Sequence, residues 1–238
     1  MTRRLGLVLA SAGGGLLLWV GVVSLWQDPF TALYTLWRQH GLSAQYERRE
    51  AGFRPAVLHS SGTSAELAAI AREARQYRRS SHPGEAMGRI EVPRLDLNAV
   101  LVDGTDHDSL MKGPGIYRGD YLPGEGELVY IAGHRTTYLA PFADINSLRR
   151  GDRVTIELPY GTFVYAITGS RIVPANDVAV LRTHHREQVI LQACQPRFSA
   201  THRYLAYAKL VSIRPRTPLS KSLQSVTRAG DTGPVRVL

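Results

Sequence analysis

Three side chains near the ends of predicted strands have the chemistry needed for acyl transfer. Cys194 is the only cysteine of the chain, and it ends the apolar run Val189–Cys194. His134 follows another apolar run and comes just after a glycine, whereas Arg203 precedes a third. A thiolate is a nucleophile, an imidazole can accept and return its proton, and a guanidinium can lower a thiol pKa or stabilise an oxyanion. The residue types therefore predict cysteine-dependent acyl transfer.

The residues after Cys194 indicate how the arginine is placed. Pro196 has no amide hydrogen, so it cannot continue a central strand. If residues 195–202 form the loop of a hairpin, Cys194 and Arg203 face each other on adjacent strands about 5 Å apart. A strand end at the mouth of a barrel is both firmly held and open to a substrate.

Each of these residues also has an ordinary structural explanation. A lone cysteine is often a buried small hydrophobe, a single histidine is often structural, and Arg203 is one of 26 arginines, since three of the 29 basic residues are lysines. One cysteine excludes an intramolecular disulfide and a two-cysteine metal site. His184, His185 and Glu187 imitate a metal site, but adjacent strand residues point to opposite faces. We expect no metal and no cofactor.

Short segments rich in β-branched and aliphatic residues follow Gly88, separated by Gly, Pro, Asp and Asn. In Arg153–Leu158 apolar and polar residues alternate, as in a sheet with one solvated face. Many short strands with few helices predict an all-β domain, a closed or nearly closed antiparallel barrel. The predicted strands are Arg89–Val92, Ala99–Asp103, Glu127–Ala132, Arg153–Leu158, Phe163–Val173, Gln188–Cys194 and Tyr204–Ile213.

The segment Leu5–Trp26 has 22 residues and no charge, which is long enough to cross a bilayer as a helix. Arg3 and Arg4 precede it, so the positive-inside rule places residues 1–4 in the cytoplasm and the rest of the chain outside. The alternative is a cleaved signal peptide, because Ala10–Ala12 resembles a cleavage site. Only five apolar residues precede that site and apolar sequence continues beyond it, which favours an uncleaved transmembrane anchor over residues 5–26.

Residues 27–86 are predicted to link the anchor to the barrel. Thr31–Gln39 is expected to form a short juxtamembrane helix, and Gly41–Ser61 to be polar and irregular. A capping box opens a helix over Thr63–Arg79, whose arginine-rich face predicts a solvated stalk. At the other end of the chain, residues 215–238 lose the apolar pattern and are expected to form a flexible tail.

The chain is strongly basic, with a net charge of +9 and a pI near 10.0. This charge favours polyanionic neighbours such as nucleic acid, anionic lipid or an acidic wall polymer. The membrane span and the lack of a recognised nucleic-acid motif oppose the first of these. We therefore expect no nucleic-acid partner.

The motifs AGHRTTY and ILQACQPRFSATHRY, together with the single span, resemble sortases, the cysteine transpeptidases that attach proteins to Gram-positive cell walls. In that pattern a histidine follows a strand, a cysteine ends a much later strand, and an arginine opens the next one. His134 and Cys194 are 60 positions apart, and Cys194 and Arg203 are nine apart. The resemblance covers residues 87–214, the expected catalytic domain.

The segments Gly133–Val154 and Cys194–Tyr204, with the juxtamembrane run LYTLW, look most like class E sortases of actinobacteria. The resemblance implies an eight-stranded barrel that acts outside the cell membrane on secreted proteins. It implies cleavage of an LPxTG or, for class E, LAxTG sorting signal between Thr and Gly, with an amine of a lipid-linked peptidoglycan precursor as acceptor. It also implies Cys194 as nucleophile, His134 as acid and base, and Arg203 as ligand of the substrate and the oxyanion.

One position departs from the sortase pattern, and two other functions stay open. Sortases commonly have a threonine next to the nucleophile, but this chain has Ala193, so we expect a substrate-contacting hydroxyl to be missing. The first alternative is a pilin-polymerising sortase, whose acceptor is a pilin lysine, although no lid-like insert precedes the barrel. The second is a non-catalytic, membrane-anchored, extracytoplasmic binding domain in which Cys194 is buried and inert.

Overall fold

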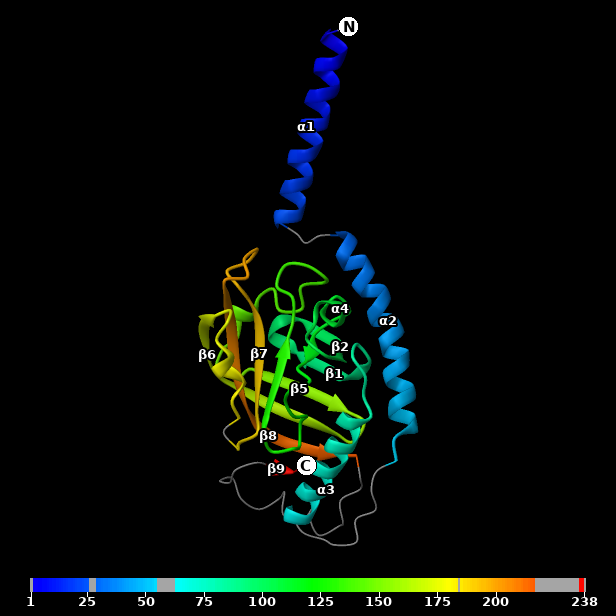
Figure 1. Ribbon diagram of the computed structural model, residues 1–238, viewed down its shortest axis with the longest axis vertical. Helices are drawn as coiled ribbons and strands as arrows, with labels where there is room; N and C mark the ends of the chain where they lie inside the picture. Colours follow the sequence, from blue (N-terminus) through cyan, green and yellow to red (C-terminus); the bar gives the residue numbers. More distant parts are fainter. Residues whose placement is uncertain (1, 26–28, 55–62, 184, 217–235, 238) are drawn as a thin grey trace.

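The computed structural model describes residues 2–25, 29–54, 63–183, 185–216 and 236–237. A β-barrel forms its centre, one helix extends from the barrel and two others pack on it (Figure 1). The strands are β1 Ala86–Val92, β2 Leu97–Asp103, β3 Gly115–Ile116, β4 Leu128–Ala132, β5 Arg153–Leu158, β6 Gly161–Pro174, β7 Gln188–Gln195, β8 His202–Pro215 and β9 Arg236–Val237. The helices are α1 Thr2–Leu25, α2 Pro29–Gly52, α3 Thr63–Arg79 and α4 His107–Leu110, with 3-10 turns at Pro93–Leu95, Ile145–Ser147 and Val178–Leu181.

Eight strands close the barrel, in the order β6-β5-β1-β2-β3-β4-β7-β8, because β6 also pairs with β8. Most neighbours are antiparallel, but β2 pairs with β3 and β4 pairs with β7 in parallel. The short β9 adds to β8 in parallel, outside the closed ring. The eight-stranded barrel is therefore confirmed, and so are all seven predicted strands, to within a few residues at their ends. Only β3 and β9 were not predicted.

Alternation along the strands explains how the barrel acquires its core. In β5 the side chains of Val154, Ile156 and Leu158 are buried in the main hydrophobic cluster, whereas Arg153 and Glu157 are exposed. Strand β6 continues the pattern through Phe163 and Tyr165, which are fully buried. A tight turn joins β5 to β6, since Leu158 pairs with Gly161.

Helix α2 is longer than predicted and packs along the outside of the barrel (Figure 1). The expectation of irregular chain after Gly41 was wrong, because the helix continues to Gly52. Leu42 and Tyr46 are buried in a separate hydrophobic cluster whose other members lie on β1 and β2. Gln39 adds three hydrogen bonds: its side-chain Nε2 donates to two carbonyls and its Oε1 accepts from Val100 N–H at 2.7 Å.

Helix α3 has the predicted bounds, but it packs on the barrel and does not form a detached stalk. Ile70, Ala74 and Tyr77 belong to the main core cluster, and the Tyr77 hydroxyl donates to the Met87 carbonyl at 2.9 Å. Its arginine-rich face remains partly exposed. The helix closes the end of the barrel opposite α1, as Figure 1 shows.

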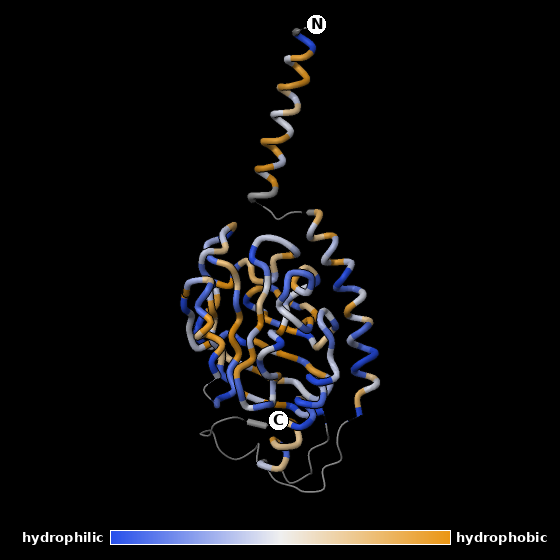
Figure 2. The backbone as a smooth tube through the Cα atoms, in the orientation of Figure 1, coloured by the Kyte–Doolittle hydropathy of each residue, from blue (hydrophilic) through white to orange (hydrophobic). Residues whose placement is uncertain are grey.

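Helix α1 extends away from the barrel and is apolar along most of its length (Figure 2). It is the one helix among the described residues that is long and apolar enough to cross a membrane, over Arg3–Val22. The predicted flexible tail, residues 215–238, lies outside the described residues except for Pro215, Arg216 and β9.

Candidate active site

The parallel pair β4 and β7 brings His134 and Cys194 to the same level. Ala132 of β4 pairs with Gln192 of β7, and the Gly133 N–H donates to the Gln192 carbonyl at 3.0 Å. His134 comes two residues after Ala132, and Cys194 comes two residues after Gln192. Two residues whose sequence positions differ by 60 therefore lie at one end of the barrel, where β4 and β7 both end.

Alternation also fixes which face of the sheet carries the thiol. Ile190 of β7 and Ala132 of β4 belong to a second hydrophobic cluster, distinct from the main core. Leu191 and Ala193 point the other way, into the main core. Cys194 shares the face of Ile190 and is half-buried, so its side chain lies outside the barrel core.

Arg203 lies directly opposite Cys194, as predicted. The two residues are paired in the antiparallel register of β7 and β8. The guanidinium Nη1 donates to the carbonyls of Ala200 at 2.8 Å and His202 at 3.1 Å, in the turn between the two strands. In the free protein the arginine is thus held beside the strand end that carries the thiol.

The His134 side chain is partly buried, and its ring lies beside the ring of Tyr138. Its ring centroid is 4.9 Å from that of Tyr138, and its Nε2 is buried with no hydrogen-bond partner among the described residues. Burial lowers the pKa of the imidazole, and the nearby His107 lowers it further. The neutral ring is therefore favoured at neutral pH, as a group that must accept a proton from a thiol requires.

Arg135 is a residue of the site that the sequence analysis did not single out. Its side chain is buried, and its guanidinium donates to the Cys194 carbonyl at 3.2 Å and to the Gln195 side chain. It also donates to Asn146 Oδ1 at 2.7 Å and to the Ala143 carbonyl at 3.3 Å. Arg135 therefore joins the segment after His134 to the end of the strand that carries the thiol. In sequence it differs from the other arginines only in being next to His134.

A buried carboxyl group lies on the same side of the sheet. Asp120 has one carboxyl oxygen buried without a hydrogen-bond partner in the described part of the chain, and burial raises its pKa to about 6. Burial also raises the pKa of Tyr130, which lies within electrostatic range of both Asp120 and Arg203. This face of the sheet therefore contains ionisable groups that water solvates poorly.

The structure corrects the expectation for Ala193. This side chain is fully buried in the main core cluster, on the opposite face from Cys194. A threonine at this position would direct its hydroxyl into the barrel core. The alanine therefore affects packing of the core next to Cys194, and it does not remove a hydroxyl from the face that carries the thiol.

The histidines considered as metal ligands have other roles where they are described. His184 lies outside the described residues, and His185 Nδ1 is 2.9 Å from Glu127 Oε1. Glu187 instead accepts from the Tyr165 hydroxyl at 2.6 Å and from the Gly124 N–H at 2.9 Å. Within the described ranges, no three His, Cys, Asp or Glu side chains gather as a potential metal site.

The sequence also matches a known family over the part of the chain that carries these residues. The family model described as the sortase domain matches residues 90–211. The chain belongs to the sortase family. Sortase D of Bacillus subtilis is 37% identical over 134 residues, which cover 54% of this chain and 66% of that relative. The match therefore falls just short of two thirds of the relative's length.

Solved structures of sortases share the fold. Sortase D5 of Clostridium perfringens has a TM-score of 0.58 and 20% identity, with coverage of 73% of this chain and 98% of that one. Sortase E1 of Streptomyces coelicolor, solved with a tripeptide in its active site, has a TM-score of 0.53 and 25% identity over 58% of this chain and 95% of that one. The sortase fold predicted from sequence is confirmed.

Proposed function

We propose that this sortase is a membrane-anchored, extracytoplasmic transpeptidase. It cleaves a C-terminal sorting signal of the LPxTG or LAxTG type between Thr and Gly and joins the released protein to a peptidoglycan amine. The observation that carries the proposal is the strand register: Cys194 is paired with Arg203, and Ala132, two residues before His134, is paired with Gln192, two residues before Cys194. The similarity to sortase E1 supports LAxTG, the motif expected for class E, as the sorting signal.

The first half of the reaction forms a thioester. His134 accepts the thiol proton, and Cys194 Sγ attacks the carbonyl carbon of the signal's threonine. The carbonyl oxygen becomes an oxyanion, which Arg203 stabilises after exchanging its bonds to the turn carbonyls for bonds to the substrate. The C–N bond to glycine then breaks, and His134 returns its proton to the leaving amine.

The second half transfers the acyl group. The acceptor amine attacks the thioester carbonyl, the C–S bond breaks, and Cys194 leaves as a thiolate. The proton that the amine loses passes to His134 and from there to the Cys194 thiolate, which restores the thiol and the neutral imidazole.

The proposal is tested by incubating the full chain in detergent with LAxTG and LPxTG peptides and two amines, a peptidoglycan stem-peptide mimic and a lysine peptide of pilin type. Mass spectrometry identifies the products. We expect joined product with the stem-peptide amine, and more from LAxTG. Product with the lysine peptide alone would favour the pilin-polymerising alternative. Absence of any product from the folded chain, with an inert thiol, would favour a binding domain.

A further inference from the structure

The first two turns of α2 expose large apolar side chains. Leu33 is 68% exposed, Leu36 is 55% exposed and Trp37 is 66% exposed, and Phe30 is also exposed. Phe30, Leu33 and Trp37 are spaced three or four residues apart, so they form a stripe on one side of the helix, with Leu36 at its edge. The Phe30 ring already contacts Trp19 of α1, with centroids 5.6 Å apart. A contiguous set of exposed large apolar residues such as Leu33, Leu36 and Trp37 is rare on a soluble surface.

The barrel cannot cover this stripe, because the opposite side of α2 is already fastened to it. The Thr35 hydroxyl donates to the Met111 carbonyl at 2.9 Å, and Gln39 Nε2 donates to the Lys112 carbonyl at 2.7 Å. Leu42 is buried one turn later. At about 100° per residue these three lie on one face, roughly opposite the stripe. The exposed side therefore faces away from the barrel.

The apolar stripe is confined to the end of α2 nearest α1. Further along the same side the residues become polar or small, namely His40, Ala44, Glu47, Arg48 and Ala51. Figure 1 shows that α2 runs from the α1 end of the molecule along the barrel, so only its first turns are near α1. Two turns extend about 11 Å along the helix axis, so only the end of α2 near α1 offers an apolar face.

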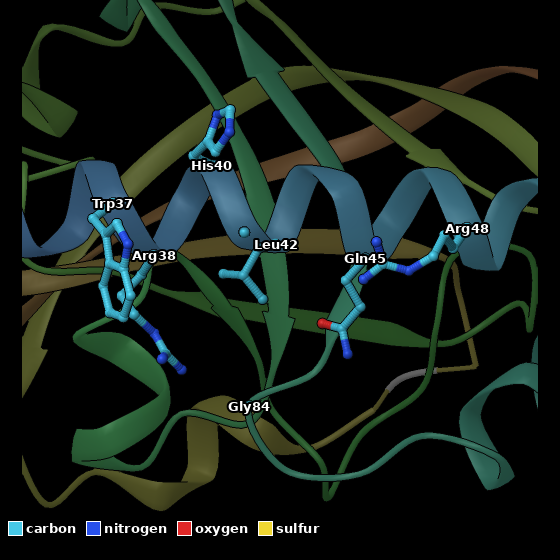
Figure 3. A pocket seen from close by; sticks show the side chains of 8 residues that line it. Trp37, Arg38, His40, Leu42, Gln45, Arg48 and Gly84 are labelled. Atoms are coloured by element: carbon cyan, nitrogen blue, oxygen red, sulfur yellow. The ribbon is translucent and has the colours of Figure 1, made fainter.

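A basic pocket lies beside the stripe. It has a volume of about 390 Å³, and Arg38 and Arg48 are its permanently charged lining residues (Figure 3). The Arg38 guanidinium is 5.6 Å from the Trp37 ring. The ion pairs of the described residues include neither of these arginines. The lining is therefore complementary to an anionic group.

We propose that the first two turns of α2 dock into the surface of an anionic bilayer. Phe30, Leu33 and Trp37 enter the boundary between headgroups and acyl chains, and Arg38 meets headgroup phosphates. Continuity with α1 identifies the partner, because a helix inserted in a bilayer brings the residues that follow it to the lipid surface. This inference rests on the proposed function only through the membrane anchor.

Docking would orient the active site. The Tyr138 N–H donates to Thr31 Oγ1 of α2 at 3.1 Å, and the Tyr138 ring lies beside His134. The strand ends that carry Cys194 and His134 are at the same end of the barrel as this contact. A docked α2 therefore turns the site toward the membrane, where a lipid-linked acceptor amine is found.

The test measures the depth of single fluorophores in vesicles. Cys194→Ala removes the only native thiol, after which Leu33→Cys, Ala51→Cys or Leu17→Cys provides one labelling site in the full chain. Leu33 and Ala51 are 18 residues apart, so they share one side of α2 about 27 Å apart and form a matched pair. Each variant is labelled with NBD and reconstituted in phosphatidylcholine and phosphatidylglycerol, with or without doxyl-lipid quenchers. Circular dichroism checks the fold.

We expect lipid quenching of the labels at positions 33 and 17 and none at position 51. Omitting phosphatidylglycerol should reduce quenching at position 33 at least twofold. Quenching at position 17 without quenching at position 33 would overturn docking but leave the anchor. Equal quenching at positions 33 and 51 would show a helix lying flat, contrary to the proposal. No quenching at position 17 would overturn both the anchor and docking, whereas peptide activity in detergent tests the chemistry separately.

Discussion

At the scale of single residues, Arg135 explains how the thiol is held in place. One buried guanidinium contacts the carbonyl of Cys194, the side chain of the next residue and two groups of the segment after His134. It touches no reacting atom, so we regard it as a positioning residue. Such fork-shaped contacts are specific to arginine, because a lysine keeps the charge but has a single ammonium group.

We predict that Arg135→Lys lowers kcat/KM for the sorting peptide by about ten- to a hundredfold, chiefly through kcat. The rate of Cys194 alkylation in the native state should change as well, which a purely structural loss would not cause. Arg197→Lys is the matched control, since Arg197 contacts Ala143 and Asp144 of the same segment but is exposed. Equal effects of the two substitutions would refute the positioning role.

Asp120 makes stability depend on pH. Burial raises its folded pKa to about 6, above the ordinary value of an aspartate, so the unfolded chain loses this proton more easily. The stability associated with the protonated carboxyl is fully present below about pH 4 and is lost as the pH rises through about 6. Asp120→Asn should therefore raise the Tm at about pH 8 more than at about pH 5. A Tm change that is the same at both pH values would contradict this assignment.

The candidate site was predicted to the extent that its residues lie at strand ends. The apolar run before Cys194, the proline after it and Arg203 together indicated the hairpin register that the structure confirms. Arg135 could not be distinguished from the other arginines, because its role depends on hydrogen bonds to groups that only the folded chain brings close to it. The expectation that Ala193 removes a substrate-contacting hydroxyl was wrong, because the resemblance to the sortase motif does not tell which face of β7 a side chain occupies.

At the scale of elements, the strands were predictable and the helices were less so. Alternation within a strand is a local signal, so β5 was found with its observed bounds. The strand β3 has only two residues, too few for any period. The length of α2 was missed because Gln39 and Gln45, which appear as solvated polar residues, bond to the backbone of β1 and β2.

These contacts predict that α2 is part of the folded domain. Gln39→Ala leaves the Val100 N–H and two carbonyls without their partner, so we expect a loss of about 1 to 3 kcal/mol in the free energy of unfolding. His40→Ala, at the next and exposed position, should change it by less than about 0.5 kcal/mol. Chemical denaturation of the full chain in detergent compares them. Indistinguishable midpoints would show that α2 does not stabilise the barrel.

At the scale of the whole molecule, the apolar helix α1 is followed along the chain by α2, which packs on the barrel, and then by the barrel domain itself. The strand ends with His134 and Cys194 lie at the barrel end nearest α1, and α3 closes the other end (Figure 1). A membrane anchor at α1 would thus place the site close to the bilayer.

The most direct test of the central claim is to trap the acyl-enzyme. The full chain is mixed with an LAxTG peptide without an acceptor amine, quenched in acid, and digested for mass spectrometry. We predict a thioester between the peptide's threonine carbonyl and Cys194, absent from Cys194→Ala, whose stability should stay within about 1 to 2 kcal/mol of wild type. Cleavage of the peptide by Cys194→Ala at the wild-type rate, or an acyl group on any other residue, would contradict the account.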